Sequence, residues 1–222
     1  YGSSSDFFSG NTSILKKINL SRFTDLFQCD YKIYQIDKNN YLLGTTIKDK
    51  NSKIFIKKKI FINLSKRKIK IRLDLTNVPD SIVRLFKMTI NPKALNEKQL
   101  TLKTHNGGKY LEHFHINENL NHGAAIENVS NYTSSNSSLG VTQEKIILGD
   151  KRKSIIFEID KSLSSLVGMI EYTKLKKNYF LRLFFSAFES DDTSVYMGKK
   201  NFSASITIKA QRKSINFFKW EF

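Results

Sequence analysis

The sequence has few of the features that mark several common classes of protein. Its one cysteine, Cys29, excludes an internal disulfide and leaves no pair of thiols for a metal site. Its two prolines and ten scattered glycines exclude low-complexity and collagen-like sequence. No stretch approaches the roughly 18 apolar residues that a membrane-spanning helix needs, and no signal peptide is visible. We therefore expect no transmembrane segment and no cofactor, and we favour the cytoplasm, although the sequence does not fix the compartment.

Apolar residues recur instead in short runs with a period of two. In 68–75 four aliphatic residues alternate with four charged ones, which is typical of a strand with one buried and one solvated face. The preceding run alternates as well, and Ser65-Lys66-Arg67 predicts a hairpin turn between them, as Gly149-Asp150 does further on. The predicted strands are 26–36, 40–48, 53–64, 68–76, 82–90, 100–104, 109–116, 144–148, 154–160, 167–174, 178–187 and 202–210.

A dozen short strands at roughly even spacing predict an all-β fold, a large antiparallel two-sheet sandwich with very little helix. Helix signals are limited to a turn or two in 80–87 and in 161–167. Residues 1–13 are small and polar and predict a linker or disordered arm before a single β-sandwich domain over 14–222. Residues 117–140 are rich in Asn and Ser and long for a loop, which favours a functional excursion.

All four histidines, His105, His113, His115 and His122, lie within 101–123. Histidine is suited to metal binding and to proton transfer near neutral pH, so this stretch is the first place to look for chemistry. If 109–116 is a strand, His113 and His115 share one face and Glu112 lies on the other.

Three uses of these histidines are open. The stretch from Gly107 through His113-Phe114-His115 is similar to the first metal-binding motif of cupins, but the spacing to Glu118 is one residue short and no second motif follows, so we expect no metal. Acid–base work on a sugar would use His113 or His115 with Glu112 or Glu118. A hydrogen-bonded scaffold is favoured over both. The candidate ligand-binding residues are His105, Asn106, His113, His115, His122 and Arg182.

Arg182 is a candidate because it lies inside the apolar run 179–185, which predicts a central strand covered on both faces. A buried guanidinium needs a carboxylate, and Glu171 or Glu189 could supply it.

The net charge of +17, with a pI near 9.8, predicts attraction to polyanions. The lysines are spread along the whole chain, however, which favours an evenly solvated basic surface. Most phenylalanines lie within predicted strands and not between basic groups, so we expect nucleic acid less than glycan as a partner.

The run IKKKIFINLSKRKIKIRLDLTN (56–77), followed by IVRLFKMTIN (82–91), resembles the hairpin and return strands of galactose-mutarotase-like β-supersandwich domains. The segments 101–108, 138–150, 168–172 and 179–194 are similar to C-terminal β-domains of polysaccharide-active enzymes, including family 57 glycoside hydrolases. The resemblance covers residues 20–210. It implies a two-sheet supersandwich that accompanies a catalytic barrel preceding Tyr1, since the chain begins without Met. The His and Glu of mutarotase catalysis cannot be placed by motif, so no catalytic residue is carried over.

These observations predict a carbohydrate-associated β-sandwich domain, an accessory or C-terminal domain of a polysaccharide-active enzyme that binds glycan or packs on a catalytic domain. We expect no catalysis by the isolated chain. The alternatives are a catalytic sandwich of the glycoside hydrolase or sugar epimerase class, and a basic module that binds nucleic acid or acidic polysaccharide.

Overall fold

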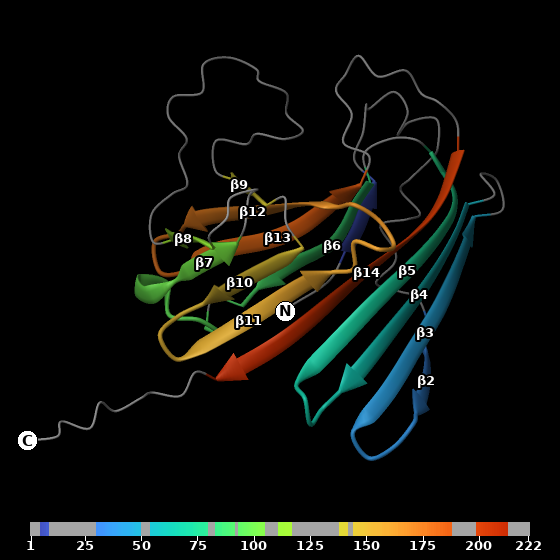
Figure 1. Ribbon diagram of the computed structural model, residues 1–222, viewed down its shortest axis with the longest axis horizontal. Coiled ribbons are helices and arrows are strands. Elements are labelled where there is room, and N and C mark those ends of the chain that lie inside the picture. The colour runs from blue at the N-terminus through green and yellow to red at the C-terminus, as the bar shows by residue number, and fades with distance from the viewer. Residues whose placement is uncertain are drawn as a thin grey trace, which may run out of the picture.

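The computed structural model describes residues 5–8, 30–49, 54–79, 83–91, 93–104, 111–116, 138–141, 144–187 and 199–212. Within these residues the chain forms fourteen strands and one short 3-10 helix, Glu97–Gln99 (Figure 1). The strands are β1 (Ser5–Phe8), β2 (Lys32–Gln35), β3 (Asn40–Asp49), β4 (Ile54–Asn63), β5 (Lys68–Pro79), β6 (Val83–Ile90), β7 (Thr101–Thr104), β8 (Glu112–His115), β9 (Ser138–Val141), β10 (Lys145–Gly149), β11 (Lys153–Ile159), β12 (Val167–Lys174), β13 (Tyr179–Ala187) and β14 (Lys199–Arg212).

The strands form two antiparallel sheets. The larger has nine strands in the order β2-β3-β4-β5-β14-β11-β10-β7-β8, and the smaller has five in the order β1-β6-β13-β12-β9. In Figure 1, β2, β3 and β4 extend to the right, away from β12 and β13 of the smaller sheet. The sheet order joins strands far apart in sequence, because β14 pairs with β5 along one edge and with β11 along the other.

The core lies between the sheets and follows the alternation of the strands. On β5, Ile71, Leu73 and Leu75 are at most 6% exposed, whereas the residues between them are half-buried. Burial of each such side chain contributes about 1.5–3 kcal/mol to folding. Burial declines toward β2, whose four residues are all exposed. The largest fully buried side chains of the two sheets include Ile56, Leu73, Leu102, Phe157, Phe86, Tyr172 and Phe185.

Turn chemistry fixes two of the hairpins. Between β4 and β5 the Asn63 side chain accepts a hydrogen bond from the Lys66 backbone N–H at 2.7 Å, and Arg67 adopts a left-handed φ of 48°. Between β10 and β11 the Asp150 carboxylate accepts hydrogen bonds from the backbone N–H groups of Arg152 and Lys153, both at 2.7 Å. Both hairpins lie where the sequence predicts them.

The structure confirms the predicted all-β antiparallel two-sheet sandwich. It differs from the sequence-based expectations at three places. The strand β1 lies within 1–13, the segment predicted as an arm, and pairs with β6. The strand β9 begins within the polar excursion 117–140. The helical turn considered for 80–87 is wrong for 83–87, which belong to β6. In the described part of the chain no helix is long and apolar enough to span a membrane.

Candidate functional site

The nine-stranded sheet has a core-facing side and a second side that we call the outer face. Strand register assigns the side chains: Lys59 lies opposite Gly44 and Arg72, and Lys103 lies opposite His113. Because side chains alternate along each strand, the outer face carries many polar and basic residues beside apolar ones such as Leu42, Phe55 and Phe61. Its polar and basic side chains include Lys32, Tyr34, Lys57, Lys59, Lys70, Arg72, Lys103, His113 and His115.

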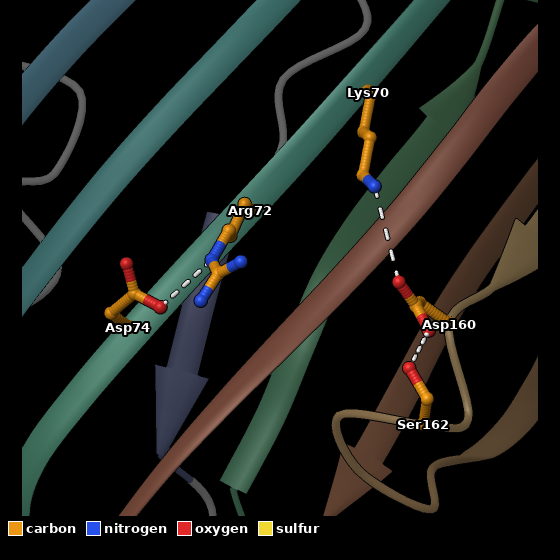
Figure 2. Close-up of polar contacts among 5 residues, drawn as sticks. All are labelled: Lys70, Arg72, Asp74, Asp160 and Ser162. Atoms are coloured by element: carbon orange, nitrogen blue, oxygen red, sulfur yellow. Dashed lines mark hydrogen bonds and ion pairs between the residues drawn. The ribbon is translucent and has the colours of Figure 1, made fainter.

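In the middle of the outer face the charges are paired. Arg72 donates from Nε to Asp74 Oδ1 at 2.9 Å, and Ser203 Oγ donates to the same oxygen at 2.6 Å. Burial of Asp74 opposes its ionisation, but the Ser203 hydroxyl and the Arg72 guanidinium outweigh burial and lower its pKa. Lys70 Nζ lies 3.9 Å from Asp160 Oδ2 (Figure 2). In the middle of the sheet, the cations Arg72 and Lys70 are therefore paired with carboxylates of the protein itself.

His113 and His115 lie on β8, the last strand of the described sheet. Both are exposed, and their ring centroids are 5.1 Å apart with the rings tilted by 37°. Phe114 between them packs against the core, and Glu112 lies on the same side as Phe114. The alternation expected from sequence is therefore present, and it separates Glu112 from the two imidazoles.

Arg182 lies on β13 of the smaller sheet, so the structure does not bring it together with His113 and His115. Its guanidinium stacks over the Phe180 ring, with the guanidinium carbon 4.6 Å from the ring centroid. Strand register pairs Arg182 with Glu171 on β12. Leu181 and Leu183 are fully buried while Phe180 and Arg182 are half-buried, so one face of β13 is more fully covered than the other.

Four candidate site residues lie outside the described residues, namely His105, Asn106, Glu118 and His122, as do Cys29 and Glu189. Among the described residues no group of three or more His, Cys, Asp or Glu side chains is arranged to hold a metal ion.

The outer face is hollowed at its β2–β4 end. A hollow of about 400 Å³ opens over Gly44, and we call it the Gly44 hollow. Lys32 and Tyr34 on β2 line one side, Thr46 on β3 lines the floor, and Lys57 and Lys59 on β4 line the other side. Tyr34 is 54% exposed, so its ring is open to solvent. The volume lies in the range of small-molecule binding sites, about 300–1,000 Å³.

Sequence reasoning interpreted the lysines of the Gly44 hollow as solvated charge and did not single out Gly44 or Tyr34. One signal was available, because Gly44 interrupts the apolar and β-branched residues of a predicted strand, 40–48. A glycine inside a strand marks a bulge, a bend or the close approach of another group.

A second polar region lies at the end of the sandwich near the β10–β11 hairpin. The Asp150 carboxylate, 6% exposed, accepts hydrogen bonds from three backbone N–H groups, the third that of Asn96 at 2.9 Å. Burial raises the pKa of the Tyr172 hydroxyl, and its hydrogen bond to Glu97 Oε1 at 2.8 Å raises it further. These contacts join the 3-10 helix to both sheets, so we assign this region to structure.

No protein-family model matches the sequence, and no curated protein matches it. Solved structures resemble the fold. The GH36 α-galactosidase of Geobacillus stearothermophilus, solved with stachyose, gives a TM-score of 0.50 at 8% identity, over 84% of this chain and 28% of that one. A putative aldose 1-epimerase of Escherichia coli gives 0.47 at 8% identity, over 83% and 69%. A galactose mutarotase related enzyme of Lactobacillus acidophilus gives 0.44 at 10% identity, over 83% and 71%.

At these identities the likeness concerns the fold alone. The chain shares a β-sandwich with part of the α-galactosidase, and it spans little more than a quarter of that enzyme. The link to family 57 glycoside hydrolases stays a prediction.

Proposed function

We propose that this chain is a carbohydrate-associated accessory domain that binds glycan on the outer face of its nine-stranded sheet. The observation that carries the proposal is the exposed pair His113 and His115, which presents two hydrogen-bonding rings on the same side of the sheet as Lys103. Imidazole and ammonium groups suit sugar hydroxyls, because they donate hydrogen bonds without needing a deep cavity.

The fold supports the same proposal. The similar part of the α-galactosidase makes up about a quarter of an enzyme that acts on α-galactosides. By analogy, the present chain would accompany a catalytic domain and need not perform catalysis itself.

The test combines binding and turnover. A glycan array and calorimetric titration of the best ligands should give binding, with no release of reducing ends and no exchange of anomers. His113→Ala/His115→Ala should weaken binding. Glu112→Gln, on the other side of the same strand, should leave binding unchanged. Absence of binding to every glycan would contradict the proposal.

The second candidate is a catalytic sandwich that acts on sugar through His113 or His115. The short distance between the two rings favours it, since two such groups can share proton transfer. It predicts turnover that is lost in His113→Ala, and loss in Glu112→Gln if that carboxylate is the partner. The same assays therefore separate the two candidates.

A further inference from the structure

The Gly44 hollow has the composition of a binding site for an acidic sugar. We propose that it binds a carboxylate-bearing sugar unit of an anionic polysaccharide, with Lys57 and Lys59 on the carboxylate and Tyr34 against the ring. This inference rests on the proposed function, because it names the class of glycan and the place where its charge is read.

The first observation is the open position of Gly44 inside β3. The register of β3 is unbroken against β2 from Tyr41 to Gly44 and against β4 from Asn40 to Asp49, so no bulge accounts for the glycine. A Cβ built on Gly44 would meet only the Lys58 carbonyl oxygen, at 4.0 Å, among the described atoms, so packing does not require a glycine either. The open space over Gly44 therefore leaves room for a ligand to lie against the backbone of β3, which is one of the situations that a glycine inside a strand marks.

The second observation is the excess of positive charge around the hollow. Lys32, Lys57 and Lys59 line it, and Asp30 is the one carboxylate among its described lining residues. Asp74 lies opposite Lys57 in the register and its pKa is lowered partly by Lys59, but its oxygen Oδ1 already accepts from Arg72 and Ser203. An incoming carboxylate would therefore find lysines whose charge is only partly compensated, and charge-assisted hydrogen bonds are the stronger ones.

The shape favours a sugar over a nucleic acid. One exposed aromatic ring, Tyr34, stands beside Leu42 and the Thr46 side chain, which together offer an apolar surface and a hydroxyl for one ring with several hydroxyl groups. Further along the outer face Asp74, Glu158 and Asp160 alternate with the cations. These carboxylates can accept hydrogen bonds from the hydroxyl groups of neighbouring sugar units.

The hollow and the histidine pair lie at opposite ends of the same face. Seven strand spacings separate Gly44 on β3 from the histidines on β8, which at about 4.8 Å each is roughly 34 Å along the sheet. A polymer could reach from one to the other, whereas a single sugar could not.

The probe is polygalacturonate, a polymer of sugar carboxylates, with its fully methyl-esterified form as the uncharged match. We expect the protein to bind polygalacturonate roughly tenfold more tightly than the ester. Lys57→Gln/Lys59→Gln should remove this preference. Lys176→Gln/Lys177→Gln removes the same charge from the exposed turn between β12 and β13 and should keep it. Tyr34→Ala should weaken binding of both polymers, whereas Ile33→Ala, its exposed neighbour pointing to the other side of β2, should not.

Each other outcome overturns the inference in a distinguishable way. Equal binding of polygalacturonate and its ester would be compatible with the proposed function, but it would contradict recognition of the carboxylate by Lys57 and Lys59. Equal losses in the two lysine double variants would show an effect of net charge alone. Tighter binding of single-stranded DNA at the same salt, unaffected by Tyr34→Ala, would identify a nucleic-acid module. Failure to bind any glycan would end both proposals. Urea unfolding of each variant confirms that it is folded.

Discussion

The middle of the nine-stranded sheet and its β2–β4 end differ although they belong to one continuous ladder. In the middle, β5 and β14 bury one face against the smaller sheet and pair their charges on the other. At the end, β2 is exposed along its whole length, and the lysines surround a hollow. Lysine and aliphatic residues alternate in both regions. In the middle of the sheet this alternation stabilises the fold, whereas at the β2–β4 end it leaves lysine side chains available to a ligand.

The largest expected effect concerns burial. Leu73→Ala, in the middle of the sheet and 0% exposed, should lower the free energy of unfolding by about 2–5 kcal/mol. Ile33→Ala at the β2 end, where the side chain is 67% exposed, should change it by less than about 0.5 kcal/mol. Urea denaturation of both variants measures the contrast. Similar losses in the two would show that the β2 end is packed as tightly as the middle.

Two strand glycines sharpen the comparison. A Cβ on Gly168 of β12 would lie 2.9 Å from the Phe185 ring and 3.3 Å from Val141, so Gly168→Ala should destabilise by about 1–3 kcal/mol. The added methyl group of Gly44→Ala would come no closer than 4.0 Å to a described atom, the Lys58 carbonyl oxygen, so this change should raise stability by about 0.4–1 kcal/mol through the unfolded chain. Thermal unfolding of the two variants shows whether each substitution raises or lowers stability. A destabilising Gly44→Ala would contradict the role assigned to the hollow.

Two aspartates close hairpins by similar hydrogen bonds. Asp150 is buried, and its backbone hydrogen bonds lower its pKa despite the opposing effect of burial. Asp37, in the exposed β2–β3 turn, accepts from the backbone N–H groups of Asn39 and Asn40, which also lowers its pKa. Because both pKa values are lowered on folding, each contribution is complete above the ordinary value of 3.8 and is lost as pH falls through the folded pKa.

Asp150→Asn should therefore cost about 1–3 kcal/mol at pH 7, because an amide N–H₂ would face a backbone N–H group. It should also flatten the loss of stability below pH 3.8. Asp37→Asn should have a smaller effect on both. Unfolding curves from neutral pH down to acid measure this, and an equal pH dependence in Asp150→Asn and the unchanged protein would contradict it.

The smallest effect concerns the surface ion pairs. Lys70 and Asp160 are 43% and 37% exposed, so water screens their attraction. Lys70→Gln should cost less than about 1 kcal/mol, and the cost should shrink further in about 0.5 M salt. Lys57→Gln should cost still less. Urea midpoints at two salt concentrations distinguish them, and a large, salt-independent cost for Lys70→Gln would show a more buried pair than the structure describes.

Strand periodicity made much of the fold predictable. The run 68–75 places Ile71, Leu73 and Leu75 in the core and its charged residues on the outer face, because period-2 alternation and burial select the same register. The strand β1 was not predictable, because its pairing with β6 joins residues about eighty positions apart and its four residues, SDFF, are too few to show a period of two. Sequence order likewise gave no sign that β14 lies between β5 and β11.

The candidate site was predictable only in part. Spacing placed His113 and His115 on one face, which the structure confirms. The sequence did not separate Arg182 from them, because sheet membership depends on long-range pairing. The lysines of β4 read as evenly spread charge along the chain, and only the neighbouring strands β2 and β3 gather them around Tyr34 and Gly44.

Backbone amide chemical shifts during titration with a short galacturonate oligomer test the central claim most directly. We expect the largest chemical-shift changes to cluster at Lys32, Gly44 and Lys59 on the β2–β4 end, with little change on β12 and β13. Shifts confined to the smaller sheet, or absent from β2, β3 and β4 at a saturating concentration of the oligomer, would contradict it.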